Sequence, residues 1–216
     1  MGPSVFVTGG TGYIGTALLP ALLARGYAVH ALTRAGSAAR LPAAAVGVPG
    51  DALSGDSFAA AIPPGASVVH LVGTPHPNPA KAAEFRRVDL GSIRATTQAA
   101  ARAGAAHLVY VSVAHPAPVM RAYIAARVEG EALVRATGIA ATILRPWYVL
   151  GPGHRWPILL APIYALLRAT PATRAGAERL GLVTREEMVA SLVRAVADPP
   201  REGVRIVEVP QIRRRP

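Results

Sequence analysis

A glycine-rich turn near the start of the chain has the residue types and spacing that suit a bound pyrophosphate. It follows a β-branched segment at residues 4–8 and consists of Thr8, Gly9, Gly10, Thr11, Gly12, Tyr13, Ile14 and Gly15. Gly10, Gly12 and Gly15 satisfy the spacing G-x-G-x-x-G. The first glycine allows a tight turn, the second lets the backbone approach phosphate, and the third lets the following helix pack closely on the strand. The amino end of that helix supplies N–H groups and a positive dipole. The alternative is a glycine-rich turn that packs without any ligand. The position of this turn between a predicted strand and a predicted helix favours dinucleotide binding.

The charges after this turn indicate which dinucleotide would bind. An NAD site usually has an acidic residue about 20 positions after the glycines, which accepts hydrogen bonds from the ribose 2′-hydroxyl. Here every charged residue between Gly15 and Asp51 is an arginine, and Arg34 directly follows the second predicted strand, at residues 28–33. A guanidinium suits the 2′-phosphate of NADP, so we prefer NADP(H) to NAD; a solvated loop cation is the alternative for Arg34. Asp51 is placed to reach the adenine edge, or else serves a local turn.

Strand and helix patterns alternate along the chain. Apolar segments without polar alternation predict strands that are buried on both faces, at residues 4–8, 28–33, 46–48, 67–72, 107–112 and 140–144. Helical spacing occupies residues 14–25, 81–103 and 119–136. Such alternation predicts an α/β fold, a doubly wound parallel Rossmann sheet.

The last third of the chain is less regular. A Pro-rich stretch follows Gly151, and a capping box at Thr184 and Glu187 starts a helix through Ala197, with a last strand at 203–209. We therefore expect a dinucleotide-binding domain at residues 1–150, and a small C-terminal lobe at 151–216 that completes the same domain.

Several motifs resemble the extended and atypical branch of the short-chain dehydrogenase/reductase superfamily. They are TGGTGYIG (8–15), VVHLVG (68–73), LVYVS (108–112), YIAAR (123–127) and LRPWYVLGPG (144–153). Within that branch the chain is most similar to epimerase/dehydratase-like and NAD(P)H-binding proteins, near the NADPH-binding accessory subunit of respiratory complex I. Some of those relatives bind the cofactor without established turnover. The resemblance also implies that Gly73 and Pro146 lie against the cofactor.

The resemblance implies catalytic roles for Tyr123, Arg127 and Ser112, with two departures from the family pattern. Tyr123 would be the general acid/base, but Arg127 stands where the family has a lysine that lowers the tyrosine pKa and holds the ribose. Alternatively, Arg127 pairs with Glu131 at the surface. Ser112 matches the first serine after the fifth strand, whereas the position of the usual catalytic hydroxyl holds Ala114. Ser112 either serves in its place or simply closes the strand end.

Other polar side chains follow the predicted strands. His76, His115 and His154 would converge at the carboxyl ends of the strands and replace the acid/base group or attract a metal; as isolated loop residues they would do neither. The second interpretation is favoured, so we expect no metal site. Trp147 and Tyr148 either wall a substrate pocket or pack within the C-terminal lobe.

Composition excludes several classes of protein. The chain has no cysteine, which excludes disulfides, thiolate metal sites and cysteine nucleophiles. Its net charge of +11 comes without a recognised nucleic-acid module, so nucleic acid is not the expected partner. The apolar run 156–167 is interrupted by prolines and is shorter than the roughly 20 residues of a membrane-spanning helix. No secretory signal is evident, so we expect a cytoplasmic location.

Two hypotheses of function follow. In the first, the chain is an NADP(H)-dependent oxidoreductase or epimerase acting on an unknown small molecule. In the second, it is a non-catalytic NADP(H)-binding regulatory or accessory protein, and the run 156–167 docks a partner or a membrane surface.

Overall fold

Seven parallel strands form the central sheet of the computed structural model, which describes residues 2–153, 167, 169 and 171–214. The strands, in their order across the sheet, are β3 (Val46–Pro49), β2 (Ala28–Thr33), β1 (Ser4–Thr8), β4 (Ser67–His70), β5 (His107–Val111), β6 (Ala141–Arg145) and β9 (Val204–Glu208). The predicted doubly wound Rossmann sheet is confirmed. The strand order reverses between β1 and β4, and in such sheets ligands bind outside the carboxyl ends of the strands at this point.

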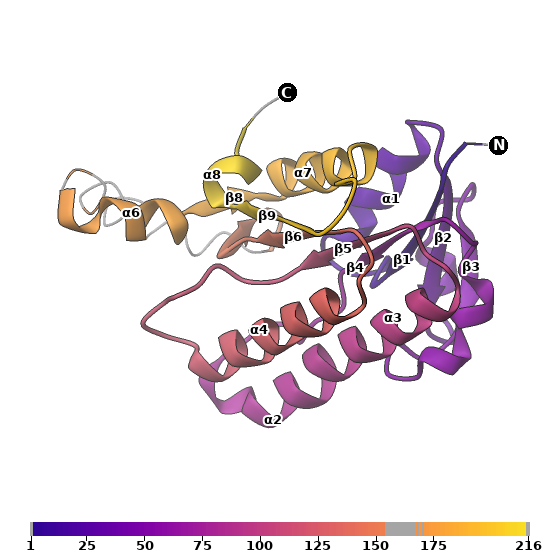
Figure 1. The fold of residues 1–216 in the computed structure, drawn as a ribbon, viewed down its shortest axis with the longest axis horizontal. Coiled ribbons are helices and arrows are strands. Elements are labelled where there is room, and N and C mark those ends of the chain that lie inside the picture. Colours follow the sequence, from indigo (N-terminus) through magenta and orange to yellow (C-terminus); the bar gives the residue numbers. More distant parts are fainter. Residues whose placement is uncertain (1, 154–166, 168, 170, 215–216) are drawn as a thin grey trace.

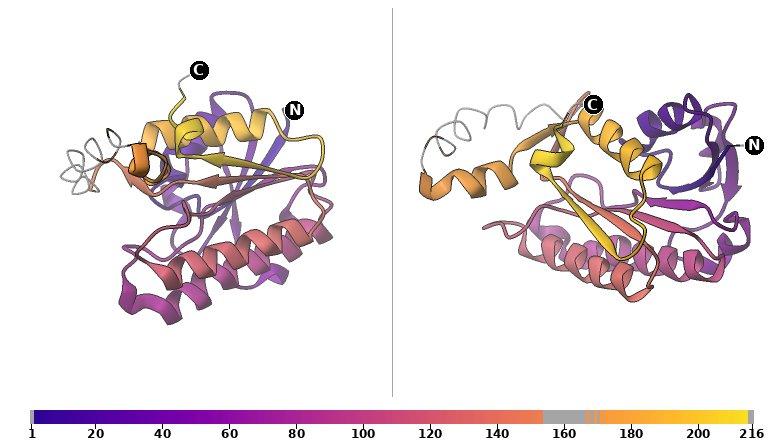
Figure 2. Two further views of the ribbon diagram at one scale, coloured as in Figure 1. Left: turned by 60° about the vertical axis from the view of Figure 1, so that its left-hand side comes forward. Right: turned by 45° about the horizontal axis from the view of Figure 1, so that its top comes forward.

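Helices cover both faces of the sheet (Figure 1; Figure 2). The helices are α1 (Gly15–Leu23), α2 (Ala82–Glu84), a π-helical segment (Phe85–Leu90), α3 (Gly91–Arg102), α4 (Arg121–Ala136), α6 (Pro171–Arg179), α7 (Arg185–Ala197) and α8 (Val209–Ile212). Short 3-10 turns lie at Ala38–Arg40, Gly55–Ser57, Ala59–Ala61 and Pro79–Lys81. Helices α3 and α4 cover one face, and α1 and α7 cover the other.

The two faces of the sheet form two separate apolar cores because successive strand residues point to opposite sides. Phe6 of β1 and Val68 of β4 belong to the core beneath α3 and α4. Their neighbours Val5, Val7 and Val69 belong to the core beneath α1 and α7. All five are fully buried, as the unbroken apolar character of these strands predicts.

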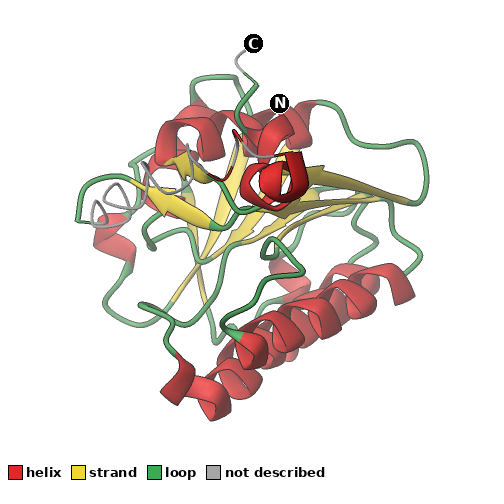
Figure 3. Ribbon diagram, turned by 90° about the vertical axis from the view of Figure 1, so that its left-hand side faces the viewer, coloured by secondary structure: helices red, strands yellow, loops and turns green. Residues whose placement is uncertain are grey.

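A second, smaller sheet lies beyond the carboxyl end of β6. It pairs β7 (Tyr148–Leu150) in parallel with β8 (Leu182–Thr184), and α7 follows β8 directly (Figure 3). The predicted capping box is present, since Thr184 Oγ1 accepts from Glu187 N and the Glu187 carboxylate accepts from Thr184 N. This device fixes the start of α7.

Two details differ from the sequence expectation. The helix expected at 81–103 is one 3-10 turn, then α2, the π-helical segment and α3. One reason is that a π turn places an extra residue in the helix, which periodicity alone does not reveal. The fourth strand ends at His70 rather than at residue 72.

Of the apolar run 156–167, the structure describes Leu167 alone. No helix among the described residues is long and apolar enough to cross a membrane.

Candidate dinucleotide-binding site

The glycine loop sits at the carboxyl end of β1, beside the loop that follows β4. Gly9 has a positive φ of 77°, and a Cβ there would lie 2.9 Å from the carbonyl carbon of Leu71. A Cβ at Gly15 would collide with the carbonyl oxygens of Gly9 and Gly10. The loop can therefore close in this shape only with glycine at these positions.

The loop has donors to offer a phosphate. In the part of the chain that the structure describes, neither the Ile14 nor the Gly15 amide donates a backbone hydrogen bond to a carbonyl. Unpaired amides in the first turn of a helix are an anion site. Gly12 is exposed, and a Cβ there would meet only the Gly9 carbonyl, so its backbone is open to an approaching group. Thr11 and Tyr13, both half-buried, flank it. These residues fit a pyrophosphate.

Beneath the loop lies a buried polar network centred on His70. Its Nδ1 lies 2.9 Å from Thr8 Oγ1 and 2.9 Å from Thr96 Oγ1, while Nε2 lies 3.3 Å from Ser92 Oγ. Burial, and then the nearby charge of Arg127, lower the pKa of His70 to about 3. Thr8 is thus a support of the loop from below, and its hydroxyl is fully buried.

The two residues predicted for the adenosine half are both exposed. Arg34 follows β2, which is next to β1 in the sheet, and Asp51 comes after β3, which pairs with β2 on its other side. Asp51 Oδ1 accepts a hydrogen bond of 2.9 Å from Leu53 N, which is the local turn role. The Arg34 side chain is exposed just beyond the carboxyl end of β2.

Arg127 points into the core rather than toward a ribose. Its side chain is 6% exposed, and its Nη2 lies 2.6 Å from Oδ1 of the fully buried Asp89. Its Nη1 donates to the Val111 carbonyl at 2.9 Å. The surface pair of Arg127 with Glu131 does not form, because both side chains are buried and each has another partner.

Asp89 also holds the loop after β4. Its Oδ2 accepts from Thr74 N at 3.1 Å and from Thr74 Oγ1 at 2.6 Å. A Cβ at Gly73 would collide with the Arg127 guanidinium, so the backbone at Gly73 lies directly against this ion pair and leaves no room for a side chain. The π-helical segment that carries Asp89 thereby fixes both Arg127 and the loop.

Ser112 is likewise committed to a buried partner. Its hydroxyl donates to Glu131 Oε1 at 2.7 Å, and Arg145 Nε donates to the same oxygen at 2.8 Å. Arg145 also reaches Glu208 of β9 at 3.0 Å. Burial acts to raise the pKa of Glu131, but the hydrogen bonds from Arg145 and Ser112 outweigh it and hold the pKa below its usual range.

Tyr123 is half-buried on the first turn of α4. Its ring lies 5.0 Å from that of Phe85 and 5.3 Å from Arg127 Cζ. Together with Pro79, Met120 and Arg121 these two rings line a small pocket. Arg127 thus lies against the tyrosine ring, and Asp89 pairs with its charge.

The remaining candidates lie as follows. His115 Nε2 is 3.5 Å from Glu131 Oε1, His76 is exposed, and His154 lies outside the described residues. Over the described parts of the chain no group of histidine and acidic side chains could hold a metal ion. The Pro146 carbonyl accepts from Ala114 N at 2.9 Å, joining the loops after β5 and β6.

Trp147 and Tyr148 contact each other edge to face, with ring centroids 5.6 Å apart. Both side chains are half-buried.

A comparison with protein families gives the chain its relatives. A family model described as NAD(P)H-binding matches residues 9–156. The chain belongs to this NAD(P)H-binding family. This match confirms the expected relationship to NAD(P)H-binding proteins.

Individual relatives share about a third of their residues with this chain or fewer. A ceramide reductase from Caulobacter vibrioides is 31% identical over 130 residues, which are 60% of this chain and 40% of the reductase. The matched part thus spans well under half of that relative. Among solved structures, the Bordetella bronchiseptica enzyme WbmH in complex with NAD+ has a TM-score of 0.70 at 21% identity, covering 94% of this chain and 74% of that one. The Thermus thermophilus UDP-glucose 4-epimerase complex with NAD has a TM-score of 0.68 at 19% identity, with 95% and 77% covered. These likenesses show the fold.

The sequence alone does not predict the acidic residues that pair with Arg127 and Arg145. Asp89 and Glu208 belong to no recognisable motif, and the sequence suggests Glu131 only as a partner of Arg127. One signal was present: Asp89 is an acidic residue inside a segment that must pack on the sheet, and such a residue needs a buried partner.

Proposed function

We propose that this chain is an NADP(H)-binding protein in which the polar groups of a dehydrogenase site stabilise the structure, so that it acts as a regulatory or accessory protein. The observation that carries this is the commitment of Arg127 to Asp89 and the Val111 carbonyl. A guanidinium held in this way has little to offer a ribose. The Ser112 hydroxyl, which donates to Glu131, supports the same conclusion.

Preference for NADP(H) rests on Arg34. Arg34 is exposed at the end of β2, and the sequence from Gly15 to Asp51 lacks the acidic residue that NAD sites usually place there. A 2′-phosphate would therefore be attracted by the guanidinium and would not be repelled by a carboxylate. The glycine loop and its first-turn amides would bind the pyrophosphate. When bound, the nicotinamide ring supplies hydride chemistry, and the residues of this chain hold and orient the dinucleotide.

The cofactor preference is tested with Arg34→Ala. We expect NADPH to bind this variant roughly 10- to 100-fold more weakly, because a charge-assisted contact to phosphate is lost, and NADH to bind as before. Calorimetric titration measures both. Arg40→Ala is the matched control, since Arg40 is also exposed and lies in the same loop region. Equal affinities of the unaltered chain for NADPH and NADH would refute the preference.

A second candidate is a reductase that uses Tyr123 as the proton donor. Two observations favour it: Tyr123 lines a small pocket with Phe85 and Met120, and one relative is named a ceramide reductase. In this case the Tyr123 hydroxyl would protonate a carbonyl oxygen as hydride arrives from the nicotinamide.

Turnover separates the two candidates. We expect no NADPH oxidation above background with a panel of ketones, quinones and sphingoid ketones. Oxidation that Tyr123→Phe lowers by about 100-fold or more would establish the reductase and overturn the non-catalytic role. Unchanged NADPH affinity of Tyr123→Phe is the control for intact binding.

A further inference from the structure

The C-terminal part of the chain reaches the glycine loop through the ring of Tyr13. Arg185 Cζ lies 5.5 Å from the centroid of this ring, which is cation–π distance. A Cβ at Gly151 would overlap the Tyr13 hydroxyl and lie 3.3 Å from the ring carbon Cζ. Gly151 and Arg185 therefore both contact the side chain of Tyr13, which belongs to the glycine loop.

The small sheet brings Gly151 and Arg185 together. Leu150 of β7 pairs with Thr184 of β8, so the residues that follow them leave the sheet at the same end. A Cβ at Gly151 would lie 3.3 Å from the Arg185 Cβ. Arg185 is the first residue of α7, and the capping box of Thr184 and Glu187 fixes its backbone. The position of Arg185 is therefore set by ordered neighbours.

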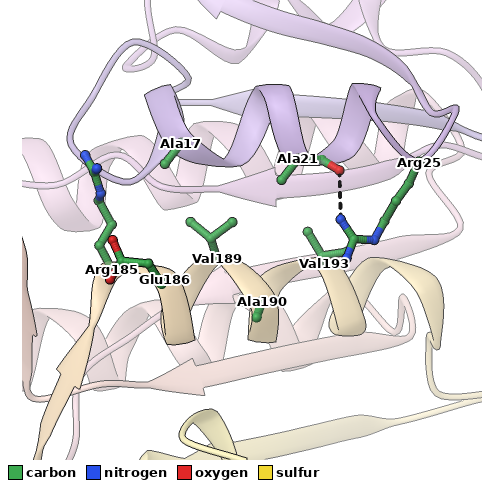
Figure 4. A pocket seen from close by; sticks show the side chains of 8 residues that line it. All are labelled: Ala17, Ala21, Arg25, Arg185, Glu186, Val189, Ala190 and Val193. Carbon is green, nitrogen blue, oxygen red and sulfur yellow. Dashed lines mark hydrogen bonds between the residues drawn. The ribbon is translucent and has the colours of Figure 1, made fainter. Parts of the chain in front are cut away.

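Arg185 stands at one end of a groove between α1 and α7, and Arg25 stands at the other (Figure 4). Small apolar side chains, among them Ala17, Ala21 and Val189, lie between them. Arg25 donates to the Ala21 carbonyl at 3.1 Å, at the end of α1 that is remote from the glycine loop. The two arginines share a groove, but only Arg185 contacts the loop.

We propose that Arg185 and Gly151 are positioning residues for the cofactor: through the Tyr13 ring they hold the glycine loop in the shape whose amides receive the pyrophosphate. The inference rests on the proposed binding of NADP(H). The amides of Ile14 and Gly15 follow Tyr13 directly in the chain, so contacts that hold the Tyr13 side chain in place restrain the backbone that carries these amides.

Calorimetric titration with NADPH tests the role of Arg185. We expect Arg185→Gln to bind about 3- to 10-fold more weakly, the loss typical of one cation–π contact. Arg25→Gln removes the same charge from the same groove and is expected to keep the affinity within about twofold. Thermal unfolding without ligand checks that both variants are folded.

Rescue tests the role of Gly151. Gly151→Ala is expected to weaken NADPH binding because its methyl group displaces the Tyr13 ring. Adding Tyr13→Phe removes the hydroxyl that is struck and is expected to restore the affinity, which a general loss of stability would not do.

Equal affinities of Arg185→Gln and Arg25→Gln, or no rescue by Tyr13→Phe, would overturn the inference and leave the proposed function standing. No NADPH binding by the unaltered chain would overturn both.

Discussion

Asp89→Ala is expected to lower the free energy of unfolding by about 3–5 kcal/mol, because it leaves the buried Arg127 guanidinium without a counter-charge. Asp89 is fully buried and Arg127 is 6% exposed, so water cannot replace the lost carboxylate. The change also removes the acceptor of the Thr74 amide and hydroxyl. Urea unfolding followed by circular dichroism measures the loss.

The matched control is Glu129→Ala. Glu129 lies 3.5 Å from Arg94 in a pair that is about half exposed, and such pairs are worth at most about 1 kcal/mol. A loss for Asp89→Ala no larger than that of the control would show that Arg127 finds another partner or becomes hydrated. The account of Arg127 as a structural cation would then be wrong.

Acid is expected to destabilise the fold well before the carboxylates titrate. Burial, with the charge of Arg205 second, lowers the pKa of His107 to about 4, and His70 has a pKa of about 3. Both stay neutral in the folded chain while the unfolded chain takes up protons near the ordinary histidine value of 6.5. The stability that depends on these two neutral histidines is therefore fully present above pH 6.5. It is lost as the pH falls toward 4, by up to about 1.4 kcal/mol per pH unit for each histidine.

Urea unfolding at pH 7 and pH 5 measures this, and we expect a difference on the order of 3 kcal/mol. His70→Gln and His107→Gln should each flatten the pH dependence, and the double variant should remove most of it. A double variant with the slope of the unaltered chain would show that other groups take up the protons.

Local pattern was enough to predict the sheet and the glycine loop. The segments that became β1, β2, β4, β5 and β6 are mainly apolar and lack polar alternation, as is typical of parallel strands that are buried on both faces. The loop was predictable in part because contacts within a few residues require glycine at Gly15, where a Cβ would strike the carbonyl oxygens of Gly9 and Gly10.

The fate of the polar side chains was not predictable from the same information. Helical spacing places Tyr123 and Arg127 one turn apart, but it does not say which partner lies across from them. Arg127 meets Asp89 across 38 positions of the chain because α4 packs on the π-helical segment. Ser112 meets Glu131 because β5 ends beside α4. These pairings follow from packing and strand register, which no single segment encodes.

Arg145 joins Glu131, on the helix before it, to Glu208, on the last strand of the sheet. During translation the chain grows from its amino end, so α4 and β6 leave the ribosome long before residue 208. Until then Arg145 has only one of its two carboxylates, and the β6 edge that will pair with β9 is uncovered. The strands up to β6 can thus come together while the polypeptide is still being made, but the outer edge of β6 is covered only after β9 has emerged.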